Sequence, residues 1–152
     1  MKFSYAKSLS LSVMLLSMLP IHVPAFAADP IRAMAVDEIE FRPDANVPGV
    51  ATALIAGNPK EGPSYTVLAK FSPNTRVPAH FHPDRRVITV ISGTYYLGGG
   101  EKFDEVALKA YRPGMVIIIP ARAPHFSASR EDGTVVEESG DGATGSTLTE
   151  RK

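Results

Sequence analysis

Short apolar segments separated by turn residues are the feature that most restricts the folds open to this chain. Between residues 50 and 139 such segments recur roughly every 8–12 residues, and most are shorter than a typical helix. The intervening turns are rich in glycine and proline, of which the chain has 12 and 13. This spacing is typical of an all-β sandwich or barrel. We therefore predict one all-β domain without an internal repeat.

The individual strands are predicted from apolar or alternating stretches bounded by turns. Residues 51–56 and 64–71 flank the turn sequence GNPKEG and predict a hairpin. The apolar run within 113–120 is typical of a buried strand, and residues 101–111 are the stretch that favours a helical turn. The remaining predicted strands are residues 76–82, 86–93, 94–100, 124–129 and 134–139.

The domain boundaries follow from changes in composition along the chain. The predicted barrel covers residues 49–142, preceded by an irregular, proline-punctuated N-terminal segment at 28–48. Residues 143–152 are small and polar, which predicts a C-terminal tail. A chain of 152 residues is long enough for one domain and hardly for two.

The first 27 residues have the composition of a cleavable signal peptide. Lys2 and Lys7 give a positive start, residues 9–19 form a short apolar run, and Ala-Phe-Ala at 25–27 is an A-x-A cleavage pattern. The alternative is a retained membrane anchor, but the apolar run is well short of the ~20 residues of a spanning helix. We therefore predict export, to the periplasm or to the outside of the cell.

Cysteine content and charge exclude several function classes. The chain has no cysteine, so thiol catalysis, thiolate metal ligands and disulfides are excluded. Basic and acidic side chains balance at 16 each. This balance argues against nucleic acid or an anionic membrane surface as a partner.

Three histidines outside the predicted signal peptide form the main functional signal: His80, His82 and His125. On a strand, His80 and His82 share a face with Cα atoms about 6.5–7 Å apart, so their imidazoles can converge on one ion. His125 is the histidine left to supply a third ligand from another strand. Such a site suits one divalent transition metal ion, Fe, Mn, Ni, Zn or Cu. The alternative is a polar strand face beside an unrelated loop histidine.

The spacing of these residues resembles the two motifs of the cupins, G-x5-H-x-H-x3-E-x6-G and G-x5-P-x-G-x2-H-x3-N. The resemblance covers most of residues 50–142 and is greatest to single-domain, exported cupins of the type-2 kind. It implies a jelly-roll β-barrel with the three histidines as metal ligands, and dimerisation, which many cupins show. The matching residues are His80, His82 and Gly93 in the first motif and Gly114, Pro120 and His125 in the second.

Four positions depart from these motifs. Asn74 and Arg122 stand where the motifs have glycine, and Ser129 replaces asparagine. The fourth departure is chemical, because Arg86 stands where the resemblance places a metal-binding glutamate. A guanidinium group has no lone pair to donate, so Arg86 is not a ligand.

Arg86 has two interpretations. In one, it faces the metal site and binds substrate, because arginine can hold a carboxylate with two hydrogen bonds. In the other, it forms an ion pair with Glu137 or Glu138, and the site has lost its metal. Strand alternation allows only one of these two glutamates to face inward, and the sequence does not say which. If it is Glu137, its carboxylate is a candidate for a fourth ligand or a general base.

The resemblance implies a metal-dependent enzyme of the dioxygenase, isomerase or lyase type. Its partner would be a small anionic or enolisable molecule as substrate. Two alternatives stay open, because a fold does not fix a function. One is a non-catalytic module that binds metal or a small ligand, and the other is a structural barrel with a decayed site.

Overall fold

A computed structural model describes residues 29–149 of the chain, so the predicted signal peptide at 1–27 lies outside the described residues. Of the described residues, 34–149 belong to one compact unit. This unit is all-β apart from the single 3-10 turn η1 (Val36–Glu38), which confirms the predicted fold class. Within residues 29–149, no helix is both long enough and apolar enough to span a membrane.

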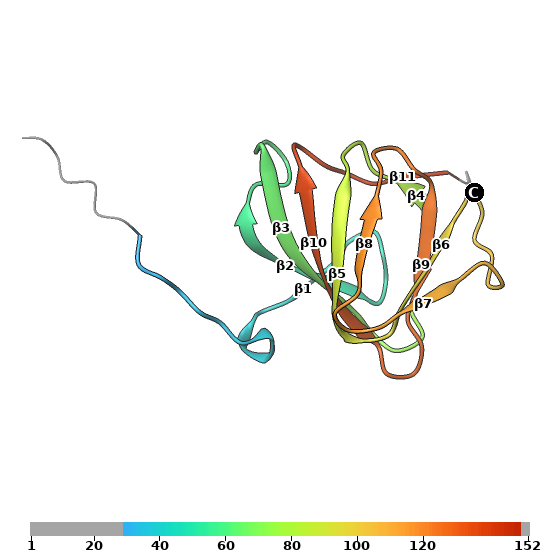
Figure 1. The fold of residues 1–152 in the computed structure, drawn as a ribbon, viewed down its shortest axis with the longest axis horizontal. Coiled ribbons are helices and arrows are strands. Elements are labelled where there is room, and N and C mark those ends of the chain that lie inside the picture. The colour runs from blue at the N-terminus through green and yellow to red at the C-terminus, as the bar shows by residue number, and fades with distance from the viewer. Residues whose placement is uncertain (1–28, 150–152) are drawn as a thin grey trace, which may run out of the picture. The chain divides into compact units, whose positions relative to one another are not determined.

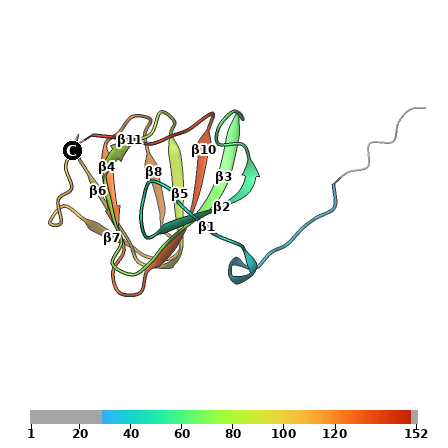
Figure 2. The same cartoon turned by 180° about the vertical axis from the view of Figure 1, so that it is seen from behind.

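The strands form two antiparallel sheets that face each other (Figure 1). The six-stranded sheet has the order β1-β2-β3-β10-β5-β8, and the five-stranded sheet has the order β11-β4-β9-β6-β7. The view from behind shows the same two layers (Figure 2). The strands are β1 (Arg42–Pro43), β2 (Val50–Gly57), β3 (Ser64–Phe71), β4 (Arg76–Phe81), β5 (Arg86–Gly93), β6 (Tyr95–Gly99), β7 (Lys109–Tyr111), β8 (Val116–Ile119), β9 (His125–Ala128), β10 (Thr134–Asp141) and β11 (Thr147–Leu148).

Most predicted strands are present close to their predicted positions. The predicted hairpin is the antiparallel pair β2–β3, and β10 lies between β3 and β5 in the larger sheet. The helical turn predicted at 101–111 is absent, and that segment ends in β7. The carbonyl of Asp104 accepts a hydrogen bond from the Ala107 amide, and the Asp104 side chain accepts one from the Val106 amide. Asp104 therefore closes a turn, as aspartate commonly does.

The apolar run at 113–120 is buried on one face only. Ile117 and Ile119 belong to the core, whereas Val116 and Ile118 are 60% and 64% exposed. The physical reason is the position of β8 at the edge of the larger sheet, where one face packs on the barrel and the other faces solvent.

The core lies between the two sheets and is made of side chains from both. Phe126 and Val136 are fully buried, and Phe71 packs edge-on against Tyr95 at 5.4 Å between ring centroids. These apolar contacts hold the sheets in fixed register, and one end of the interior is left open as a pocket. The main core cluster is Val50, Ala69, Phe71, Val77, Ile88, Val90, Tyr95, Leu97, Ile117, Ile119 and Val136.

The segments outside the predicted barrel limits are also ordered by contacts with it. Within the segment predicted as irregular, β1 pairs with β2. Within the segment predicted as a polar tail, β11 pairs with β4, and Thr149 donates a hydrogen bond to the Ala79 carbonyl. Residues 143–149 thus run along the end of the barrel where the histidines lie.

Candidate metal centre

The three histidines come from two neighbouring strands of the smaller sheet. His80 in β4 pairs with His125 in β9, and His82 follows the end of β4. The ring centroids lie 4.4 Å apart for His80 and His125 and 4.7 Å apart for His80 and His82. All three residues are buried. One candidate ligand atom from each ring lies within 4.8 Å of the others.

Each imidazole is oriented by a backbone carbonyl. Nδ1 of His80 lies 2.7 Å from the Pro78 carbonyl oxygen, Nδ1 of His82 lies 2.7 Å from that of Gly145, and Nδ1 of His125 lies 2.9 Å from that of Ala123. A carbonyl oxygen can only accept, so each Nδ1 carries a proton. Each neutral ring therefore has its lone pair on Nε2.

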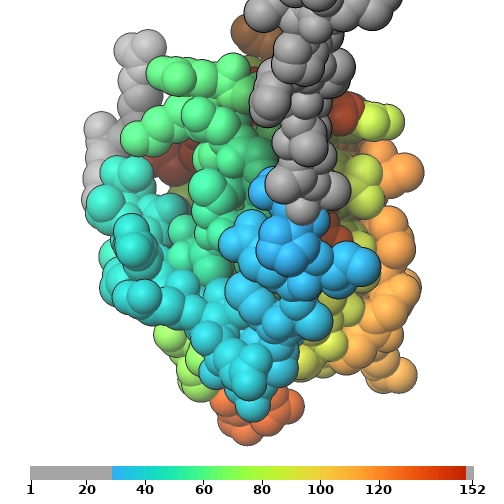
Figure 3. Space-filling view, turned by 90° about the vertical axis from the view of Figure 1, so that its left-hand side faces the viewer, coloured from blue at the N-terminus to red at the C-terminus, as the bar shows by residue number. Residues whose placement is uncertain are grey.

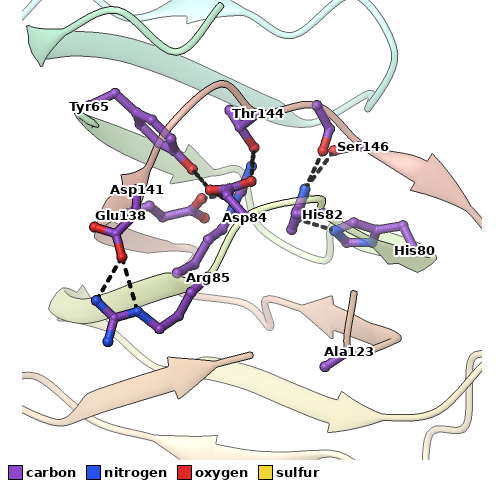
Figure 4. Close-up of polar contacts among 12 residues, drawn as sticks. Tyr65, His80, His82, Asp84, Arg85, Ala123, Glu138, Asp141, Thr144 and Ser146 are labelled. Carbon is purple, nitrogen blue, oxygen red and sulfur yellow. Dashed lines mark hydrogen bonds and ion pairs between the residues drawn. The ribbon is translucent and has the colours of Figure 1, made fainter. Parts of the chain in front are cut away.

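The Nε2 atoms of His80 and His82 are 3.1 Å apart (Figure 4). With both Nδ1 atoms protonated, this contact brings two lone pairs together and is unfavourable between neutral rings. Two nitrogens bound to one ion at about 2.05 Å are about 2.9 Å apart at a right angle and about 3.4 Å apart at the tetrahedral angle. The residues present therefore fit a divalent metal ion, and carbonyl-oriented histidines are typical of metal sites.

Burial keeps these rings neutral. It is the main cause that lowers the pKa of His80, and it lowers the pKa of His82 to about 2 and that of His125 to about 4. The positive charge of Arg86 lowers all three pKa values further. Neutral imidazole is the form that binds metal.

The two motif positions that lack glycine keep a glycine-like backbone. Asn74 has φ 57° and Arg122 has φ 61°, both in the left-handed region. At Arg122 this conformation directs the amide to the carbonyl of His82 at 2.8 Å. That hydrogen bond links the segment that leads to His125 with the segment that carries His82. The third motif replacement, Ser129, donates a hydrogen bond to the Ser72 carbonyl and accepts one from the Thr75 amide.

Arg86 lies at the start of β5 and lines the same pocket as the histidines. Its Nη1 atom donates to Glu138 Oε2 at 2.6 Å and its Nη2 atom donates to Thr144 Oγ1 at 2.9 Å. Its Nε atom lies 3.8 Å from Asp84 Oδ2 and is a buried donor without a hydrogen-bond partner among the described residues. The arginine is therefore anchored between two carboxylates.

Asp84 is the centre of this polar network, as Figure 4 shows. It accepts a hydrogen bond from the Tyr65 hydroxyl at 2.6 Å on Oδ2 and one from the Thr144 hydroxyl on Oδ1. Burial, and secondarily this hydrogen bond to Asp84, raise the pKa of Tyr65 to about 12, so the phenol stays a donor. Because Thr144 accepts from Arg86, its own proton points to Asp84, which is therefore an ionised acceptor.

The structure places Glu138 in the pocket in the position predicted for Glu137. Glu138 is buried and lines the pocket, whereas Glu137 does not line it and accepts a hydrogen bond from Ser139. The reason is the regular alternation of β10, which pairs continuously with β3 and has Val136, Glu138 and Gly140 on its inward face, so Glu137 lies on the other face.

The pocket has a volume of about 260 Å³ and opens at the end of the barrel near the C-terminal segment. Figure 3 shows a hollow between the cyan and green residues of the β1–β3 region, with dark red C-terminal residues behind it. Its polar lining includes His80, Arg86, Glu138 and Thr144, and the rest of the wall is mostly apolar, with Asp44 and Thr52 as polar members. Its apolar lining includes Val50, Val67, Ala69, Phe71, Val77 and Ile88.

Four residues of this site are not indicated by the sequence pattern: Tyr65, Asp84, Thr144 and Gly145. Asp84 stands in a Pro-Asp turn and Thr144 and Gly145 in a small polar segment, where such residues are ordinary. Of these four residues, only Asp84 could have been suspected from the sequence, because it lies two residues after His82 of the H-x-H pair. The other three residues reach the site through contacts between segments that are far apart in the sequence.

Part of the chain is similar to a known protein family. Residues 67–137 match the family described as "Cupin domain". No curated protein sequence matches the chain. Among solved structures, the polyketide cyclase RemF from Streptomyces resistomycificus is 15% identical, with 81% of this chain and 88% of that chain covered and a TM-score of 0.67.

Two further structures are similar in fold. An uncharacterized conserved protein with a double-stranded β-helix domain from Klebsiella pneumoniae is 21% identical, with 80% of this chain and 100% of that chain covered and a TM-score of 0.59. The DMSP lyase DddQ from Ruegeria pomeroyi is 13% identical, with 73% and 61% covered and a TM-score of 0.58.

The fold and the site define a small β-barrel protein with a candidate three-histidine metal centre inside the barrel. The match of residues 67–137 to the cupin domain family, together with the similar fold of these solved structures, confirms the resemblance inferred from the two motifs.

Proposed function

We propose that this protein is an exported, metal-dependent cupin enzyme of the dioxygenase, isomerase or lyase type that acts on a small anionic or enolisable molecule. The observation that carries the proposal is the convergence of three imidazoles whose Nδ1 atoms are occupied by carbonyls. That convergence is unfavourable without a cation and favourable with one. The fold also serves in structures described as a cyclase and a lyase.

His80, His82 and His125 would hold the ion through Nε2. A divalent ion held there can act as a Lewis acid or activate water. The chain's own residues bind and orient the substrate, with its reacting end toward the histidines and its body against the apolar wall. Arg86 lines the cavity in a fixed position, and we propose that it helps to orient the substrate.

Glu138 is the residue that we propose as general base, in place of Glu137. Its carboxylate lies in the pocket, and Arg86 fixes its orientation. In the proposed step, a proton on carbon or oxygen of the bound molecule passes to the Glu138 carboxylate, and the electron pair of the broken bond stays on the substrate.

Metal titration tests the proposed centre. Protein prepared without a polyhistidine tag and stripped with a chelator should bind one equivalent of at least one of Fe, Mn, Ni, Zn and Cu. The reason is that three pre-oriented nitrogen donors lose little freedom on binding. Metal analysis after gel filtration measures the stoichiometry. A content well below one equivalent for all five metals would favour the decayed-site alternative.

Export is proposed from the sequence of residues 1–27 alone. The full-length chain expressed in a bacterial host should be recovered from the periplasm or the medium with Ala28 as its first residue. Intact-mass spectrometry of the fractionated protein measures this. A protein that keeps residues 1–27 and stays with the membrane would support the anchor alternative instead.

A further inference from the structure

The charge of the pocket differs from what Arg86 alone would suggest. Arg86 contributes one positive charge, but Glu138 lies 2.6 Å from its Nη1 atom and Asp84 lies 3.8 Å from its Nε atom. All three side chains are at least 88% buried, with exposed fractions of 12%, 11% and 1%. The cluster Asp84–Arg86–Glu138 therefore carries one net negative charge inside the barrel.

This net charge limits the charge of a ligand. The three histidines are neutral, so a divalent ion at the centre would be offset in part by the cluster, and about one positive charge would remain. A ligand with one negative charge, or one that develops such a charge during reaction, matches that remainder. A second negative charge would lie near the buried carboxylates of Glu138 and Asp84, and like charges repel strongly where burial weakens solvent screening.

The wall and volume of the pocket limit the rest of the ligand. Away from the histidines the lining is mostly apolar, with Val50, Val67, Ala69, Phe71 and Ile88, and its polar members are Thr52 and the partly exposed Asp44. A polar body against the apolar part would lose its hydration without gaining hydrogen bonds. The volume of about 260 Å³ is below the ~300–1,000 Å³ of pockets for drug-sized ligands.

We propose that the ligand of this pocket is a small molecule with a compact apolar body and a single anionic or enolisable head, and that the Asp84–Arg86–Glu138 cluster excludes dianions such as phosphate esters and dicarboxylates. This inference rests on the proposed metal centre and narrows its substrate class. Arg86 orients the head without adding net positive charge to the pocket.

The test uses the zinc-loaded protein without the predicted signal peptide, residues 28–152. Its affinities for two pairs of small carboxylate ligands are measured by calorimetry at pH 7.5. Benzoate should bind at least ten-fold more tightly than acetate, because its ring meets the apolar wall. Monomethyl phthalate should bind more tightly than phthalate, which has nearly the same size and one more negative charge. Failure of the wild-type protein to bind any of Fe, Mn, Ni, Zn and Cu would reject the metal centre itself, whereas metal binding together with a preference for phthalate would reject only this inference.

Three variants connect that preference to the cluster. Glu138→Gln should shift the affinity ratio by about ten-fold toward phthalate, and Arg86→Gln should shift it away from phthalate, because each changes the pocket by one charge. Glu137→Gln changes the neighbouring carboxylate outside the pocket and should leave the ratio within about two-fold. Thermal unfolding checks that each variant is folded. If Glu138→Gln does not fold, the order of affinities of the wild-type protein for the four ligands still decides. Failure of the wild-type protein to bind benzoate would overturn the inference.

Discussion

Replacing His80 or His125 by Ala should lower the affinity for a divalent metal more than 100-fold. Loss of an outer-shell partner typically costs about 10–100-fold, and removal of a ligand costs more. Each histidine provides one of three converging donor atoms, so a variant keeps only two. Titration of the chelator-stripped protein with Zn²⁺ in competition with a chromophoric chelator measures the affinity.

The fold should survive these substitutions. Each removed ring takes part in the close contacts among the imidazoles, so its loss relieves a crowded site while the apolar core stays intact. Ser146→Ala is the matched control, because it removes only the 3.3 Å contact to His82 Nδ1 and keeps the Gly145 carbonyl. Its affinity should stay within about three-fold of wild type. A folded His80→Ala or His125→Ala protein with wild-type affinity would show that the residue is not a ligand.

Gly140→Ala should lower the free energy of unfolding by about 2–4 kcal/mol, the sum of overpacking and disrupted buried hydrogen bonds. Gly140 in β10 lies opposite Tyr65 in β3 and Arg86 in β5. A Cβ atom there would overlap the Tyr65 hydroxyl and the Asp84 carboxylate. Both groups are buried and joined by a 2.6 Å hydrogen bond, so neither can move without breaking the network.

Urea denaturation measures this effect, with Gly145→Ala as the control. A Cβ atom on Gly145 meets nothing within 4 Å, so that substitution should change stability by less than about 0.5 kcal/mol. Equal stability of the two variants would mean that the space beside Gly140 is not filled by Tyr65 and Asp84.

The strands and the histidine site were predictable because they depend on local spacing. Alternation places His80 and His82 on one face, and the pairing of β4 with β9 then brings His125 beside them. Asn74 and Arg122 show that a motif can also predict backbone conformation. Both stand where the motifs have glycine, and both adopt the left-handed backbone that glycine favours. A left-handed backbone costs roughly 1–2 kcal/mol for a residue with a side chain.

The features that the sequence did not predict depend on contacts between segments far apart in the chain. Alternation in β10 allows either Glu137 or Glu138 to face inward, and the packing of Val136 into the core is what places Glu138 on the pocket side. The apolar run at 113–120 does not encode that β8 lies at a sheet edge, and so Val116 and Ile118 face solvent. Asp84 and Thr144 are 60 residues apart, and no local pattern predicts their hydrogen bond.

The carbonyl of Gly145 that orients His82 affects when, during synthesis, the metal site can take its final geometry. His82 leaves the ribosome 63 residues before Gly145, and β4 gains its outer neighbour only with β11. In a nascent chain that has formed the barrel core but does not yet include Gly145, the imidazole of His82 is still free to rotate. Metal loading in its final geometry should therefore follow completion of synthesis, after export if the chain crosses the membrane unfolded.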